Sequence, residues 1–460
     1  GQQRITSLYV TLMGLTARGT DYSRICFDAK DQKFTFRDPD NKRYVSVCDI
    51  WGDAALDILD SLEKPFTAAY KRCWKILQTY PISTVIVAVK DLPAVCKIFQ
   101  RINQSGKRLD RFDLISSMTF STDFDLREKF TQDILTFLKE NAFGEISPAT
   151  VTQLMALLKN GACTERAEYS LTAQEIKELW QTVIEGILLA ADTLRKNFGV
   201  KNRQYLPYDA LLTLLAYFFA KYRNRSLTGE QLEWVSKWFW RASFSLHYGS
   251  GGPTKMGQDA ELFDSLQKGE QPPFKPSMNL TTETLIGTKM TRSGSAIRNA
   301  FLCLLAQRGP LHLVNNGPLD LINGSVSDFT SAEKHHIFPQ AFLRRSGVAP
   351  AEVHDLPNFC FLPAELNKRI SDTRPSVYFP ELATENKRLS EALGTHLIPL
   401  GEDSGLQDDN YLQFLKSRAE MILQEIERLS GLSVAPLKTK DSMLLSRSRC
   451  AFATSYTRHS

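Results

Sequence analysis

The chain has 460 residues, of which 43% are hydrophobic and 23% are charged, and its formal net charge is +5. These values are ordinary for a folded globular protein of roughly two to four domains, and they exclude a low-complexity or disordered chain. The net charge is too small to establish nucleic-acid binding. No two cysteines stand at C-x-x-C spacing, so we expect neither a zinc knuckle nor a disulfide framework, and reduced thiols fit a cytoplasmic protein. The longest apolar run, residues 210–220, is too short to cross a bilayer, so we expect no membrane contact.

Residues 1–121 mix strand and helix signals, which predicts an α+β domain. Short β-branched segments predict strands at 44–47 and 83–89. Helical periodicity predicts helices at 53–62, 65–80 and 92–102, and a polar loop at 103–108 follows the last of them.

Residues 122–308 are predicted to form an all-helical middle domain. Apolar residues recur there at three- and four-residue spacing in 130–138, 151–158, 173–198, 208–222 and 229–247. Frequent prolines then predict a small, loop-rich domain at 309–432, closed by a helix at 409–429. Residues 433–460 show little periodicity and are expected to be a flexible tail. The predicted fold class is α+β, predominantly helical.

The residues that carry chemistry gather in the loop-rich domain. His335 and His336 are adjacent, Asn358 ends an Asp-Leu-Pro-Asn segment, and Asn367 opens the run Asn-Lys-Arg-Ile-Ser-Asp. Hydrolysis of a phosphodiester needs an activated water, which a neutral imidazole can supply, and stabilisation of the leaving oxygen, which a divalent cation can supply. Adjacent residues on an extended segment point to opposite faces, so one histidine can serve a metal while the other faces the phosphate. A His-His pair alone is a weak signal, and a purely structural role is its alternative.

The spacing of these residues resembles that of the HNH, or ββα-metal, nucleases. In that family an Asp/His-His-Ile-x-Pro strand is followed by one Asn in the hairpin and a second Asn in a helix. Here residues 335–339 match the strand, Asn358 lies 22 residues after His336, and Asn367 lies nine residues after Asn358. The resemblance implies that His336 is the general base and that His335 and Asn367 are metal ligands. It also implies that Asn358 orients the hairpin and, through it, His336.

One departure from the family concerns the metal. His335 stands where the family more often has Asp, and a neutral ligand holds a hard cation less tightly. The expected divalent metal is therefore Mg²⁺ or Mn²⁺, with Zn²⁺ as a further alternative. Lys368 and Arg369 are the expected DNA-contacting residues. His354 is a candidate extra ligand, with an ordinary loop histidine as the alternative.

The chain opens with Gly1-Gln2-Gln3-Arg4, in which a glycine and an arginine suit the approach of an anion. Together with Asn103 and Gly106 in the segment 98–109, this resembles the Asp-Gly-Gln-Gln-Arg domain of GmrSD-type enzymes. That domain is similar to the ParB/sulfiredoxin fold and is linked to nucleotide binding and hydrolysis. The resemblance implies a nucleotide site at Gln2, Gln3, Arg4, Asn103 and Gly106, although a helix cap explains the last two equally well. The leading Asp of the motif is expected just before Gly1, in residues upstream of this sequence.

The combined resemblance, over about residues 1–430, is to GmrSD/SspE-type modification-dependent restriction endonucleases that act against phage. It implies DNA, modified phage DNA in particular, and a nucleoside triphosphate (NTP) as partners, and it is compatible with an oligomer. One alternative is a nucleotide-gated, ParB-like DNA-binding regulator with an inactive nuclease fold. Another is an HNH nuclease directed at RNA.

Overall fold

The computed structural model describes residues 2–17, 19–40, 42–82, 110–121, 123–321 and 336–433, with positions 88, 94, 95, 98 and 101 between them. The chain divides into two compact units, residues 1–88 and 89–460. The predicted strand at 83–89, helix at 92–102, loop at 103–108 and tail fall wholly or mostly outside the described residues. The predicted domain boundaries at 121, 308 and 432 stay predictions. The described part is α+β and mostly helical, as expected.

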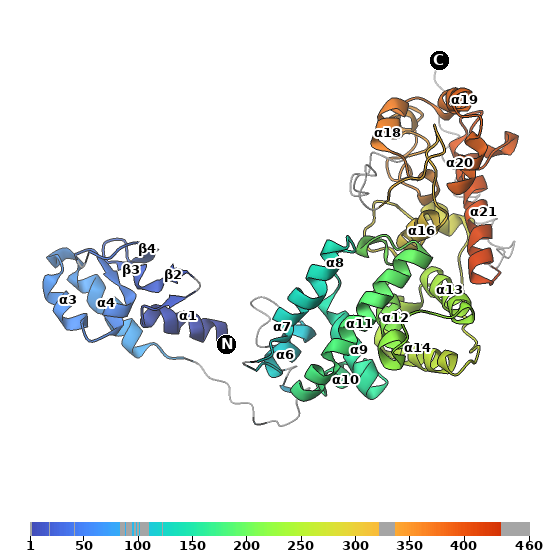
Figure 1. Ribbon diagram of the computed structural model, residues 1–460. Helices are drawn as coiled ribbons and strands as arrows, with labels where there is room; N and C mark the ends of the chain where they lie inside the picture. Colours follow the sequence, from blue (N-terminus) through green and yellow to red (C-terminus); the bar gives the residue numbers. More distant parts are fainter. Residues whose placement is uncertain are drawn as a thin grey trace, which may run out of the picture. The chain divides into compact units, whose positions relative to one another are not determined.

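The first unit packs helices against a small antiparallel sheet with the strand order β4-β3-β5 (Figure 1). Its core joins Phe27 of β3 and Val45 of β5 to Ile58 of α3 and Tyr70 of α4, all of them buried. The predicted strand at 44–47 is confirmed as far as Ser46, after which Val47 begins a helix. The elements of this unit are α1 (Gln2–Leu12), β1 (Thr16–Ala17), β2 (Thr20–Asp21), β3 (Ile25–Asp28), β4 (Lys33–Phe36), β5 (Tyr44–Ser46), α2 (Val47–Trp51), α3 (Ala55–Ser61) and α4 (Thr67–Thr79).

The second unit begins with a helical layer built around α11, which spans Ala173–Phe198 as predicted. A capping box of Thr172 and Glu175 starts this helix, and Gly199 in the left-handed conformation ends it. Gly186 lets α12 pack closely on α11, because a Cβ at that position would lie 2.7 Å from the carbonyl oxygen of Ala216. The helices of this layer are α6 (Arg111–Met118), α7 (Leu126–Lys129), a π-helical turn (Phe130–Leu135), α8 (Thr136–Glu140), α9 (Pro148–Asn160), α10 (Glu165–Tyr169), α11, α12 (Asp209–Tyr222), α13 (Gly229–Phe244), α14 (Gly252–Gln267), α15 (Thr282–Gly287) and α16 (Ala296–Gln307).

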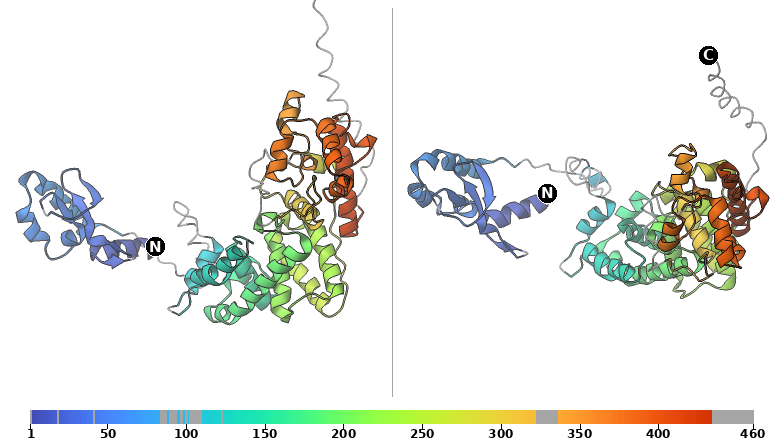
Figure 2. Two further views of the ribbon diagram at one scale, coloured as in Figure 1. Left: turned by 45° about the horizontal axis from the view of Figure 1, so that its top comes forward. Right: turned by 90° about the horizontal axis from the view of Figure 1, so that it is seen from above.

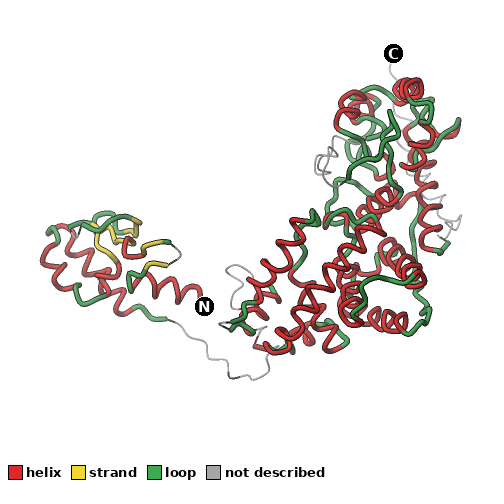
Figure 3. The backbone as a smooth tube through the Cα atoms, in the orientation of Figure 1, coloured by secondary structure: helices red, strands yellow, loops and turns green. Residues whose placement is uncertain are grey.

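A second, smaller core lies at the C-terminal end of this unit, where loops make up much of the backbone (Figure 3). Helix α21 (Tyr411–Ser430) belongs to both cores, since Phe414 and Leu415 enter the smaller one while Ile422 and Ile426 enter the larger one. Figure 2 shows α21 in red beside the yellow and green helices. The other helices of this part are α17 (Gln340–Arg345), the 3-10 turn Leu356–Asn358, α18 (Ala364–Ile370), α19 (Pro375–Glu385) and α20 (Leu389–Thr395).

The apolar run at 210–220 lies within α12, where every one of its side chains is buried. Across the described ranges, the helices are all too short or too polar to span a membrane.

Candidate functional site

The candidate site is built on two short extended segments that pair. His336 forms an antiparallel bridge with Phe359, and the Ile337 amide donates to the Asn358 carbonyl oxygen at 2.8 Å. Helix α18 begins at Ala364, only a few residues after this bridge. Proline at 363 precedes the helix at its N-cap position, where a missing N–H does no harm. The local order is therefore two paired segments followed by a helix.

Asn358 holds the pairing together from inside the protein. Its side chain is fully buried, and its Oδ1 accepts a hydrogen bond from the Phe338 amide at 2.8 Å. Its Nδ2 donates to the Phe338 carbonyl at 3.2 Å and to the Val353 carbonyl at 3.1 Å. The carboxamide thus satisfies three backbone groups that have little access to water. The same hydrogen bonds fix the segment that carries His336.

Two further side chains anchor this hairpin to the smaller core. The Tyr378 hydroxyl of α19 donates to the Ile337 carbonyl at 2.7 Å. Arg418 of α21 is fully buried and donates to the carbonyls of Pro357, His396 (2.8 Å) and Leu397 (3.0 Å). Burial lowers the pKa of the Arg418 guanidinium to about 10, a value at which it stays charged at neutral pH. The hairpin is therefore held from both α19 and α21.

A pocket of about 290 Å³ opens beside the hairpin and brings His336 and Asn367 together. His336 is almost fully buried and Asn367 is half-buried. Lys368, which is exposed on α18, also lines the pocket, as does Ser371 just after the helix. The remaining lining residues are Pro339, Gln340 and Ile370.

Ser371 adopts an unusual backbone conformation at the edge of this pocket, with φ +49° and ψ −107°. The Thr373 amide donates to the Ile370 carbonyl at 2.9 Å, which closes a four-residue turn with Ser371 at its second position. These angles are those of a type II′ turn, where glycine is favoured. Ser371 therefore carries backbone strain beside the site.

Charged groups surround the far side of the His336 ring. The Lys289 ammonium forms an ion pair with Asp355, and both lie next to His354. Burial raises the pKa of Asp355 to about 6, against the opposing effect of Lys289. Burial lowers the pKa of His354, and Arg344 and Lys289 lower it further.

The two expected DNA-contacting residues differ in their surroundings. Lys368 faces the pocket. Arg369 instead forms a two-pronged ion pair with Glu385 of α19, with one N–O distance of 2.8 Å. Both residues remain predictions as DNA contacts.

Several predicted site residues cannot be placed. His335, Asn103 and Gly106 lie outside the described residues, as do Gly1 and the side chains of Gln2 and Gln3. Arg4 is exposed on α1 of the first unit.

The residues around the pocket were tested for their fit to a divalent cation. The pocket offers an imidazole nitrogen and a carboxamide oxygen, from His336 and Asn367, and both are atom types that bind Mn²⁺ or Zn²⁺, while the oxygen also suits Mg²⁺. In the described ranges no three His, Cys, Asp or Glu side chains form a metal-binding group. The predicted centre does not need such a group there, because its ligands are Asn367 and the undescribed His335. The chemistry of the donors present fits the expected cation.

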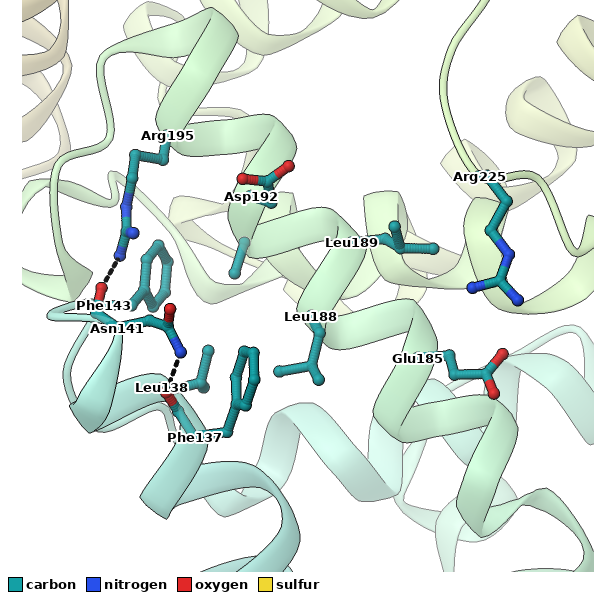
Figure 4. A pocket seen from close by; sticks show the side chains of 11 residues that line it. Phe137, Leu138, Asn141, Phe143, Glu185, Leu188, Leu189, Asp192, Arg195 and Arg225 are labelled. Carbon is teal, nitrogen blue, oxygen red and sulfur yellow. Dashed lines mark hydrogen bonds between the residues drawn. The ribbon is translucent and has the colours of Figure 1, made fainter.

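A second pocket, of about 360 Å³, lies between α8 and α11 and contains none of the predicted site residues. Figure 4 shows Phe137 and Leu188 side by side there, with Arg195 bonded to the Asn141 backbone. Its lining is largely apolar, with Arg225 and Glu185 at one end.

Sequence reasoning did not find Ser371 as a strained residue or Arg418 as an anchor, and it left His354 undecided. Only Ser371 had a signal, since it follows Asn367 closely within the motif. Arg418 lies in an amphipathic helix far along the chain, and nothing local marks it as buried.

Comparisons with known proteins bear on both units. Residues 1–120 match the family profile described as the GmrSD restriction endonuclease N-terminal domain. The chain is 25% identical over 392 residues to an uncharacterized protein of Methanocaldococcus jannaschii. That alignment covers 76% of this chain, and the chain spans 65% of the archaeal protein's length. The N-terminal part of this chain is therefore similar to that of GmrSD-type restriction endonucleases, which supports that family for the protein.

Proposed function

We propose that this chain is a modification-dependent DNA endonuclease whose cutting site is the pocket between His336 and Asn367. The observation that carries the proposal is that one pocket joins these two residues, which come from a paired extended segment and from the helix after it. This order of elements is the one expected of a ββα-metal site. The profile match at residues 1–120 supports DNA as the substrate of the whole protein.

In the proposed reaction, the His336 imidazole accepts a proton from the water that attacks the phosphorus atom. Asn358 keeps the imidazole in place through its three hydrogen bonds to the hairpin backbone. Lys368 offers its ammonium to a phosphate at the pocket edge. Asn367 and His335 would hold a divalent cation, which, when bound, supplies stabilisation of charge on the leaving oxygen.

The first unit would bind or hydrolyse a nucleoside triphosphate and control the cutting site. Arg4, exposed on α1, is the one proposed nucleotide contact whose side chain the structure describes, and its guanidinium suits a phosphate. This role rests on the family resemblance of residues 1–120.

The proposal is tested by incubating the protein with modified and unmodified phage DNA, each with and without NTP and with Mg²⁺ or Mn²⁺. We expect cleavage that requires a metal, favours the modified DNA and responds to NTP. DNA binding with no cleavage under any metal would contradict the proposal and favour the regulatory alternative. Labelled tRNA in competition with labelled DNA separates the RNA-directed alternative, since preferential cleavage of tRNA would refute the DNA assignment.

A further inference from the structure

The imidazole of His336 contacts a second imidazole on its far side. His336 Nε2 and His354 Nδ1 are 3.2 Å apart, and the ring centroids are 5.2 Å apart. The Phe359 ring packs against His336 with a centroid distance of 4.4 Å. A backbone hydrogen bond from the Met290 amide to the His354 carbonyl, at 3.0 Å, holds the His354 backbone. This contact therefore has support from both the hairpin and the segment before α16.

A hydrogen bond between two imidazole nitrogens couples the tautomers of both rings. One nitrogen must carry the hydrogen and the other must offer a lone pair. If His354 Nδ1 accepts, His336 carries its proton on Nε2, and its Nδ1 is then the basic nitrogen. If His354 Nδ1 donates, His336 Nε2 must be the acceptor, and the basic nitrogen is turned away from any substrate by the contact itself.

The charges around His354 favour the accepting state. Lys289 and Arg344 act on His354, and burial together with these two cations lowers its pKa, which disfavours the doubly protonated ring. Asp355, adjacent in sequence, is ion-paired to Lys289. A neutral His354 can accept at Nδ1 while keeping its own hydrogen on Nε2.

We propose that His354 is a positioning residue that accepts a hydrogen bond from His336 Nε2–H and so makes His336 Nδ1 the nitrogen that takes the proton from water. The idea rests on the proposed nuclease function, but its key consequence, the tautomer of His336, can be measured without any cleavage. The orientation of the general base would then depend on a side chain 18 positions along the chain, outside the His-His strand and the two asparagines.

The test compares His354→Phe, which keeps a planar ring without an acceptor, with His354→Asn, whose Oδ1 replaces the accepting Nδ1. Nitrogen NMR of histidine-labelled protein reports the tautomer, and the His336→Ala spectrum assigns the His336 signals. We expect the Nε2–H tautomer in wild type and in His354→Asn, and a loss of this preference in His354→Phe. In cleavage assays kcat should fall roughly 10–100-fold in His354→Phe with little change in KM, and His354→Asn should recover most of it.

Each outcome decides a different claim. An Nδ1–H tautomer of His336 in wild type, or the same tautomer in all three proteins, would overturn the positioning role whether or not the protein cuts DNA. Normal cleavage by His354→Phe would also overturn it while leaving the nuclease proposal standing. A wild-type protein without nuclease activity but with the tautomer shift would sink the nuclease proposal and retain the His336–His354 coupling.

Discussion

Replacing Asn358 with alanine tests whether its buried carboxamide holds the hairpin that carries His336. The substitution leaves one amide and two carbonyls without their partner, at Phe338 and Val353, in a region that is almost fully buried. Each buried polar group left unsatisfied costs roughly 1–3 kcal/mol, so the local loss should be at least about 3 kcal/mol. Since each 1.4 kcal/mol is a factor of ten, this corresponds to roughly 100-fold faster opening of the hairpin.

Hydrogen–deuterium exchange measures this opening locally, which matters because a chain with two compact units need not unfold in one step. The informative probe is the Ile337 amide, because it bonds to the Asn358 backbone and keeps its acceptor in the variant. Asn141→Ala is the matched control, since Asn141 is exposed and its side chain donates one hydrogen bond, to Phe137, at 2.9 Å. Exchange at Ile337 that is equally slow in Asn358→Ala and in the control would refute the reasoning.

Three other predictions follow from single residues. Burial lowers the pKa of His396 to about 4, against 6.5 when unfolded, so the stabilisation is complete above pH 6.5 and is lost as the pH falls toward 4. The loss at pH 5 should be about 2 kcal/mol, and calorimetry should show that His396→Gln, which stays neutral, destabilises less between pH 7 and pH 5 than wild type does; equal losses would contradict this. Ser371→Gly should relieve the strained turn and raise the stability of the smaller core by about 1 kcal/mol, measured as slower exchange in α18, whereas faster exchange would show that the turn is not strained. Lys368→Ala should weaken DNA binding and reduce the slope of log affinity against log salt by about 1, while Arg369→Ala, whose partner is Glu385, should change the slope less; equal slopes for both would contradict the assignment of Lys368 to the pocket.

Much of the fold follows from periodicity and capping. The helix at 173–198 is predicted to the residue, because apolar spacing, a capping box and a terminal glycine all agree at its ends. The predicted helix at 409–429 appears as Tyr411–Ser430 for similar reasons, with Gly431 in the left-handed conformation after it. The predicted strand at 44–47 ends one residue early because Val47 enters a helix, and short strands carry little information about where they stop.

The candidate site was predicted in its residue types and not in its supports. Motif spacing brought His336 and Asn367 to one pocket, since a hairpin followed directly by a helix is a local arrangement. The supports are non-local: Arg418 and Tyr378 reach the hairpin from helices that are distant in sequence. The contact between His354 and His336 likewise depends on how the loop before Asn358 folds back, which no periodic pattern encodes.

The most direct test of the nuclease assignment is metal-dependent cleavage by His336→Ala beside a matched histidine variant. His312→Ala is suitable, because His312 is half-buried in the same unit and does not line the pocket. Circular dichroism and DNA binding establish that both variants are folded and still engage the substrate. We predict that His336→Ala loses roughly 100-fold or more of the cleavage rate while His312→Ala retains it. Unchanged cleavage by a folded His336→Ala protein would contradict the assignment of this pocket as the cutting site.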